Sequence, residues 1–166
     1  MIIQGTRSGV DGFYGQGMEI NSGSSLRLSR VLLSDNRDVG MAVASIGTSV
    51  IADGVVIENT QSLTDGTGGR GINVQDDASF ILSRSLISGN RDVGIFALRR
   101  ASMTISDTVI KDTQILANGN GGAGVALQEG ATMILTRADF TGNLDSGMFV
   151  GDVGTDVSAS DLTIQI

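Results

Sequence analysis

The sequence predicts an all-β fold: a right-handed parallel β-helix of about six to seven coils, in which short coils of about 23 residues alternate with long coils of about 31. The first observation is a long repeat. Gly17, Gly71 and Gly124 begin similar segments at spacings of 71 − 17 = 54 and 124 − 71 = 53 residues. The second is that each repeat divides in two, because Gly40 lies 23 residues after Gly17 and 31 before Gly71.

The third observation is that each coil contains short stretches in which apolar residues alternate with polar ones, which indicates strands with one buried face. In the three short coils the apolar positions are Met18/Ile20, Leu26/Leu28 and Leu33; Ile72/Val74, Phe80/Leu82 and Ile87; and Val125/Leu127, Met133/Leu135 and Phe140. An antiparallel sandwich also uses many short strands, but it does not predict copies at a fixed spacing. A stack of similar coils about 4.8 Å apart does predict such copies. Each coil must bury its apolar face against the next coil, so the same pattern returns once per coil.

A polar column is predicted at the turn that closes each coil. Thr and Asn alternate along the chain at the same place in the repeat, at Thr6, Asn36, Thr60, Asn90, Thr113 and Asn143. We expect these side chains to point inward and to bond the neighbouring coils, because a buried amide without partners costs roughly 1–3 kcal/mol. Stacked Asn side chains form such ladders in cross-β assemblies.

Composition excludes several functions. The 166 residues include no Cys, His, Pro or Trp, so there is no disulfide framework, no Ser/His or Cys/His catalytic pair and no common zinc site. The net charge of −7 argues against nucleic acid as a partner. No apolar run approaches the ~20 residues of a membrane span, and no signal peptide is recognisable. We expect one domain, residues 1–166, that begins and ends within a repeat and is a segment of a longer solenoid.

The segment from Leu86 to Ile95, with Ile-Ser-x-Asn and a following Gly, resembles the right-handed parallel β-helix repeats of the pectate-lyase-like superfamily. The double-coil repeat is similar to that of bacterial secreted or surface β-helix proteins. The resemblance covers nearly the whole chain and implies an extracellular or cell-surface location. It does not imply one activity, since this fold hosts lyases, hydrolases, adhesins and scaffolds.

Family enzymes that cleave acidic polysaccharides use clustered Asp, sometimes with calcium, and an Arg or Lys on an outer sheet. Two sets of residues could carry such a binding role here: Asp38, Asp92 and Asp145, and Arg30, Arg84 and Arg137. The alternative is structural, with Asp in a solvated turn and each Arg lying across the next coil. Because both sets recur in every copy, we favour the structural interpretation and assign no catalytic or metal-binding residue. Weak Ca²⁺ binding by the Asp column is the one cofactor interaction that the pattern allows.

An apolar strip is predicted on the outer face of the first strands, formed by Phe96, Leu98 and Phe149. Leu63 and Leu116 of the long loops are expected to cover it; otherwise it is a partner or self-association surface. Glycine-rich loops at residues 11–17, 65–71 and 118–124 are expected to form a ridge, with Gly supplying positive φ.

Three functions follow from these observations. The first is a non-enzymatic solenoid scaffold or adhesive shaft of a secreted or surface protein, with a glycan or protein surface as partner. The second is an acidic-polysaccharide-binding or -cleaving β-helix that uses the Asp and Arg columns on one face. The third is end-to-end self-association through the outermost coils.

Overall fold

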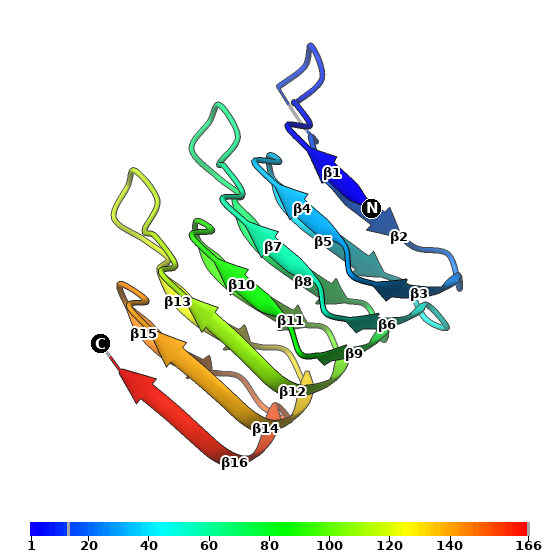
Figure 1. Cartoon of the computed structure of the whole chain (residues 1–166), viewed down its shortest axis with the longest axis vertical. Helices are drawn as coiled ribbons and strands as arrows, with labels where there is room; N and C mark the ends of the chain where they lie inside the picture. The colour runs from blue at the N-terminus through cyan, green and yellow to red at the C-terminus, as the bar shows by residue number, and fades with distance from the viewer. Residues whose placement is uncertain (13, 166) are drawn as a thin grey trace.

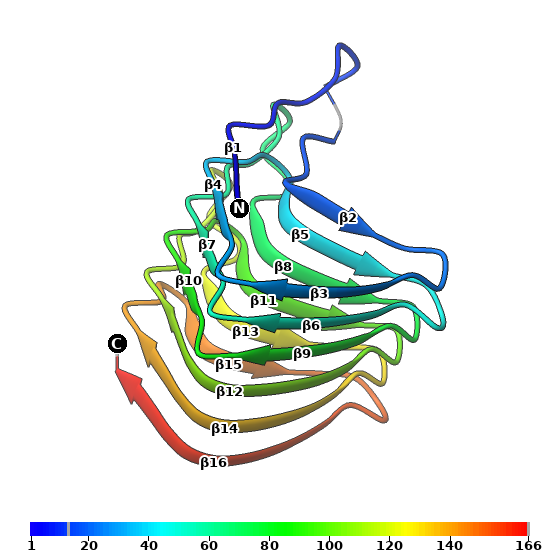
Figure 2. The ribbon, with the colours of Figure 1, turned by 45° about the vertical axis from the view of Figure 1, so that its right-hand side comes forward.

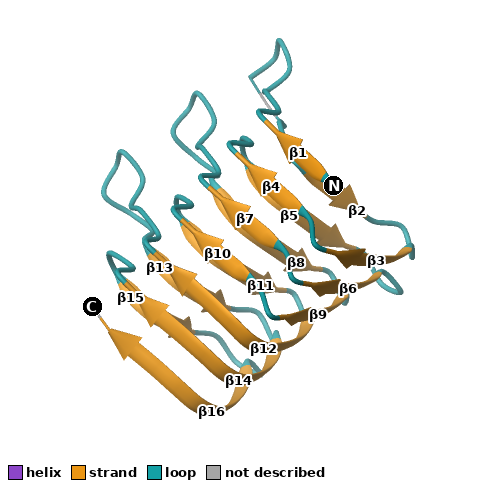
Figure 3. Cartoon of the chain, viewed as in Figure 1, coloured by secondary structure: helices purple, strands orange, loops and turns teal. Residues whose placement is uncertain are grey.

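The computed structural model describes residues 1–12 and 14–165, and over these residues it contains strands, turns and loops but no helix (Figure 3). Position 13, in the first glycine-rich loop, and position 166 lie outside the described residues. Every pairing between the named strands is parallel. The predicted parallel β-helix is therefore confirmed.

The strands form two sheets. A six-stranded sheet holds the first strand of each coil: β2 (Met18–Ile20), β5 (Val39–Ala44), β8 (Arg70–Gln75), β11 (Val93–Leu98), β13 (Ala123–Leu127) and β15 (Ser146–Val150). A ten-stranded sheet holds the remainder: β1 (Ile2–Gln4), β3 (Ser25–Ser29), β4 (Leu32–Ser34), β6 (Ser49–Asp53), β7 (Val56–Glu58), β9 (Ser79–Ser83), β10 (Leu86–Ser88), β12 (Ser102–Lys111), β14 (Thr132–Thr141) and β16 (Asp156–Gln165).

Each coil follows the same path, which Figure 2 shows as a stack of nested bends. The chain runs along the six-stranded sheet, turns, and returns through a second and a third strand of the ten-stranded sheet. In the early coils these two strands are separate, as in β9 and β10, whereas in the later coils they join into the single bent strands β12, β14 and β16. Both register lines continue through the bend, since β12 pairs with β9 at its start and with β10 at its end.

The core lies between the two sheets and consists of columns of like residues. Register places Met41, Ile72, Ile95 and Val125 in one column of the six-stranded sheet, and each is fully buried. A facing column in the ten-stranded sheet contains Leu33, Ile57, Ile87, Ile110 and Phe140, also fully buried. The apolar alternation in the sequence thus identified the inward positions correctly.

The glycine that begins each coil is required by close packing. A Cβ at Gly71 would lie 2.5 Å from the carbonyl oxygen of Gly94 and 2.8 Å from the amide nitrogen of Asn90. Positive φ, which we predicted for the loop glycines, occurs at Gly66 (+86°) and Gly69 (+97°). Gly71 is not among the residues with positive φ, so it is selected by space and not by backbone conformation.

The long coils carry their extra residues in loops that project in a row from one corner (Figure 1). These loops occupy residues 5–17, 59–69 and 112–122, between the third strand of one coil and the first strand of the next. The second and third loops contact the closing turns on both sides. In the second loop, a Cβ at Gly68 would lie 2.7 Å from Asp38 Oδ1, and one at Gly69 would lie 2.7 Å from Arg91 Cβ.

Candidate functional site

The Thr and Asn residues at the closing turn form three hydrogen-bonded pairs. The side-chain oxygen of Asn90 accepts a bond from the Thr60 backbone N–H (3.0 Å), and its amide nitrogen donates to the carbonyl of Ile57 (3.2 Å). Asn36 and Asn143 bond Thr6, Ile3, Thr113 and Ile110 in the same way. Each Asn therefore joins a short coil to the long coil before it. Four of the six side chains are buried to within 1% exposure: Asn36, Thr60, Asn90 and Thr113.

The three Asp residues of the repeat lie immediately beyond this ladder, beneath the loops. Asp38 and Asp92 have positive φ (62° and 59°), a conformation that Asp tolerates better than most residues. The carbonyl of Asp38 accepts bonds from Gly69 N and Arg70 N. Asp145 is exposed, and its backbone N–H bonds Gly122 of the third loop. This turn thus anchors the loops through backbone groups.

The Arg residues that precede these Asp residues also hold the loops. Arg37 Nη1 donates to the carbonyl of Ser62 at 2.8 Å, and Arg91 Nη1 reaches the carbonyl of Ile115 at 3.5 Å. Each bond runs from a short coil to the loop of the long coil that follows. The repeated Asn-Arg-Asp segment therefore links adjacent coils through hydrogen bonds.

The second Arg set lies elsewhere, at the bend between the second and third strands. Arg84 pairs with Asp53 at 2.6 Å, and Arg137 forms two bonds to Asp107 at 2.6 and 2.9 Å. The Arg137 guanidinium, through its hydrogen bond, lowers the pKa of the Asp107 carboxyl. Arg30 and Asp161 extend the column at either end, since each acts electrostatically on its neighbour. Positive and negative charges thus alternate along this bend.

The structure does not bring the two predicted sets together. The Arg column of residues 30, 84 and 137 lies before the third strand, whereas the Asp column of residues 38, 92 and 145 follows that strand. A polysaccharide site that uses both columns on one face requires them to be adjacent, and the third strand and its closing turn separate them. Among residues 1–12 and 14–165, no group of three or more acidic, His or Cys side chains is placed to hold a metal ion.

The predicted apolar strip is largely covered. Phe96 and Leu98 are each 8% exposed and pack in a small cluster with Val93 and Ala126, separate from the main core. Phe149 is 48% exposed. Of the two loop residues expected to cover the strip, Leu116 is buried and Leu63 is half-buried.

A polar cluster that is not repeated lies on the outer face of the six-stranded sheet, and the sequence did not indicate it. Arg70 Nε binds Asp92 Oδ2 at 2.8 Å, while its Nη1 reaches Asn73 Oδ1 at 3.4 Å. The guanidinium lies 4.3 Å from the ring centre of Phe96, a cation–π contact. Asn73 in turn donates to Gln75 at 3.1 Å. We call these five residues the Arg70 cluster.

The Arg70 cluster extends toward a half-buried carboxyl. Burial raises the pKa of Asp38, opposed by a hydrogen bond from Gln16 and by the positive charge of Arg70. Arg70 therefore acts on carboxylates of the turns on both sides, Asp38 and Asp92. Its register position is otherwise occupied by uncharged residues, Val39, Val93, Ala123 and Ser146. That departure from the repeat was the available signal.

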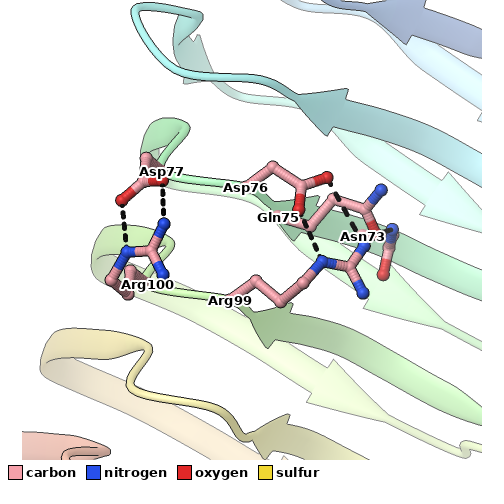
Figure 4. Close-up of polar contacts among 6 residues, drawn as sticks. All are labelled: Asn73, Gln75, Asp76, Asp77, Arg99 and Arg100. Carbon is pink, nitrogen blue, oxygen red and sulfur yellow. Dashed lines mark hydrogen bonds and ion pairs between the residues drawn. The ribbon is translucent and has the colours of Figure 1, made fainter.

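Two further ion pairs fasten adjacent coils at the turn after the first strand (Figure 4). Arg100 binds Asp77 through two bonds of 2.8 and 2.6 Å, and Arg99 binds Asp76. The hydrogen bond from Arg100 lowers the pKa of the Asp77 carboxyl. All four residues have positive φ, so the two adjacent turns that these ion pairs join both have strained backbones.

The chain belongs to the right-handed β-helix family: the family model described as "Right handed beta helix region" matches residues 3–164. Comparisons with curated proteins and with solved structures gave no match. Over the described ranges there is no helix of the length and apolar character that crossing a membrane requires.

Proposed function

We propose that this chain is a non-enzymatic β-solenoid scaffold, a shaft segment of a secreted or surface protein that carries a row of loops. The observation that supports it is that charged side chains form ion pairs between adjacent coils. The Arg residues at positions 70, 84, 99, 100 and 137 each pair with an Asp of an adjacent coil. Such side chains hold the stack in register and leave the loops as the surface that faces a partner.

Incubation with polygalacturonate and alginate, with and without Ca²⁺, tests this proposal. We expect no release of unsaturated or reducing products and no calcium-dependent change in melting temperature. Turnover that disappears in Arg70→Ala but persists in Arg84→Ala would overturn it. Arg84 is the matched control because it also pairs with an Asp of an adjacent coil but lies at the bend before β10, whereas Arg70 begins β8 in the other sheet.

The Arg70 cluster favours one second candidate, the binding of an acidic polysaccharide without cleavage. The Arg70 side chain is 32% exposed, and its guanidinium lies 4.3 Å from the centre of the Phe96 ring. A partly exposed Arg beside an aromatic ring suits a carboxylated sugar. Titration calorimetry with oligogalacturonate is the measurement, and Arg70→Ala should abolish any heat of binding.

A further inference from the structure

The third of the projecting loops (Figure 1) contains two Asn residues that differ from every other Asn of the chain. Asn118 and Asn120 are each followed directly by Gly, and no other Asn is. The second loop holds Asp65 and Thr67 at these repeat positions. An Asn before a Gly can react with the backbone, because Gly has no Cβ to obstruct attack by its own nitrogen on the Asn side chain. We propose that Asn120 is a site of spontaneous deamidation, and that the reaction releases the third loop from the closing turn of Asp92.

Hydrogen bonds restrain the reacting groups at Asn118. The nitrogen that would attack its side chain belongs to Gly119, and this N–H already donates to the carbonyl of Leu116 at 3.0 Å. The Asn118 side-chain oxygen accepts a bond from the backbone N–H of Asn120, also at 3.0 Å, which fixes the orientation of the side chain. The Gly119 nitrogen becomes free to attack only when the turn to Leu116 opens, so the folded loop protects Asn118.

The corresponding groups at Asn120 are free. Asn120 is exposed, and within the described residues its side chain makes no hydrogen bond. The attacking nitrogen here belongs to Gly121, whose N–H also has no acceptor among residues 1–12 and 14–165. The side chain can therefore rotate toward this nitrogen without breaking a bond of the fold. Of the two Asn-Gly steps, the structure favours reaction at the second.

The reaction needs water and no other reactant. The Gly121 nitrogen bonds to Asn120 Cγ, its proton passes through solvent to the side-chain amide, and the Cγ–Nδ2 bond breaks to release ammonia. The product is a cyclic succinimide. A water molecule then opens the ring at either of its carbonyls. Opening at Cγ leaves aspartate, whereas opening at the main-chain carbonyl leaves isoaspartate, in which the backbone runs through Cβ and Cγ.

Isoaspartate does not fit the contacts that this part of the loop makes. The main-chain carbonyl of Asn120 accepts the Leu116 N–H at 2.7 Å, and the N–H of Gly122 donates to the carbonyl of Asp92 at 2.5 Å. A Cβ at Gly121 would lie 2.7 Å from Asp92 Cα, so the turn leaves no room for a longer backbone. Isoaspartate adds a CH₂ group to the main chain at this point and converts the carbonyl into a carboxylate. The bond from Gly122 to Asp92 should therefore be lost.

Peptide mapping by mass spectrometry and an ammonia assay, on the full chain aged in mildly alkaline buffer, test the site. We expect the product to accumulate about threefold to tenfold faster at position 120 than at 118, the effect of one hydrogen bond to the attacking nitrogen. Asn120→Thr and Asn118→Asp are matched variants, because the second loop already holds Thr67 and Asp65 at these positions. Asn120→Thr should remove most of the ammonia release and Asn118→Asp little of it. Faster reaction at 118, or no reaction in the folded chain, would overturn the proposal.

Two further measurements test the role of the fold and the release of the loop. In urea the two sites should react at similar rates, and a preference that persists there would contradict selection by the folded loop. Hydrogen exchange at the Gly122 N–H should be faster in aged than in fresh protein. The Gly69 N–H, which donates to the carbonyl of Asp38 at 2.6 Å in the second loop, is the internal control and should not change.

The variant Asn120→Asp separates charge from backbone length. It adds the carboxylate without the extra CH₂ group, so exchange at Gly122 should stay close to that of the fresh protein. Unchanged exchange at Gly122 in chains that carry isoaspartate would overturn the release of the loop. The scaffold proposal rests on ion pairs between coils and stands whichever result is obtained.

Discussion

At the scale of single residues, the Asn of the closing turn hydrogen-bonds each short coil to the long coil before it. Asn90 is completely buried, and its one amide satisfies a donor and an acceptor on the preceding coil. A leucine of similar size would remove both hydrogen bonds from the interior. Because a buried polar group that loses its partner costs roughly 1–3 kcal/mol, the position contributes to stability well beyond its apolar contacts.

We therefore predict that Asn90→Leu lowers the free energy of unfolding by roughly 2–5 kcal/mol. Asp92→Asn is the comparison, because Asn also accepts the positive φ of 59° and only the pair with Arg70 is lost. Its effect should be about 1 kcal/mol or less. Urea unfolding of both variants measures the difference, and equal losses would show that the ladder is not the stabilising element.

Asp38 gives a prediction about pH. Burial raises its pKa above the ordinary value of 3.8, so the folded protein holds the proton more tightly than the unfolded chain. Its favourable contribution is complete below about 3.8 and is lost as the pH rises through the folded-state value. Asp38→Asn should therefore raise the melting temperature at pH 7, and the gain should vanish below pH 3.8. Thermal melts across pH measure it, with the exposed Asp145→Asn as a control that should show no gain.

Prediction of single residues from the sequence depends on whether a side chain recurs in every copy of the repeat. The Thr/Asn positions could be found because six equivalent sites show the same alternation. Arg70 could not be found in this way, because its partners Asp92 and Phe96 lie 22 and 26 residues along the chain. A residue that recurs in every copy indicates a contact that every coil makes. A contact that occurs once, between two coils, leaves no recurring pattern in the sequence.

At the scale of the strand, the glycine that opens each coil fixes how closely two coils approach. A Cβ at Gly71 would meet a backbone carbonyl at 2.5 Å, and backbone cannot move aside as a side chain can. Gly40 and Gly94 have the same surroundings, with carbonyls at 2.7 and 2.5 Å. The short distance is a property of the turn and not of one coil.

Gly71→Ala should accordingly destabilise the protein by about 1–3 kcal/mol, as overpacking of a tight core does. Gly66→Asn is the matched change in the neighbouring loop. Gly66 has positive φ, which Asn tolerates, and no atom lies within 4 Å of its added Cβ. Its effect should stay within about 0.5 kcal/mol. Guanidinium unfolding distinguishes the two, and a neutral Gly71→Ala would mean that the coils can separate at this point.

Strand positions followed from period-two alternation, but strand continuity did not. The second and third strands are separate in β9 and β10 and joined in β12, although their apolar patterns are alike. Residues at this bend have positive φ in each case, at Arg84, Asp107 and Arg137. Whether hydrogen bonding continues through the bend depends on coil-to-coil geometry that a single coil's sequence does not contain.

At the scale of the whole molecule, the repeat of 53–54 residues is the unit of stability, since it contains one short and one long coil. Removing residues 40–93 deletes one such unit and joins Val39 to Gly94. Arg30 would then face Asp107, and the short-then-long order would be kept. Removing residues 40–70 deletes only a long coil. Two short coils would become neighbours, with Arg30 beside Arg84 and Asn36 beside Asn90.

The larger deletion should therefore destabilise the protein less than the smaller one. We predict that the chain lacking residues 40–93 keeps the circular dichroism spectrum of a β-helix and melts cooperatively at a lower temperature, because solenoid stability sums over neighbouring coils. The chain lacking residues 40–70 is longer but should melt lower still, since it pairs like charges and leaves one Thr/Asn bond without its partner. If the longer chain were the more stable, coil number alone, and not the alternation of coil types, would determine stability.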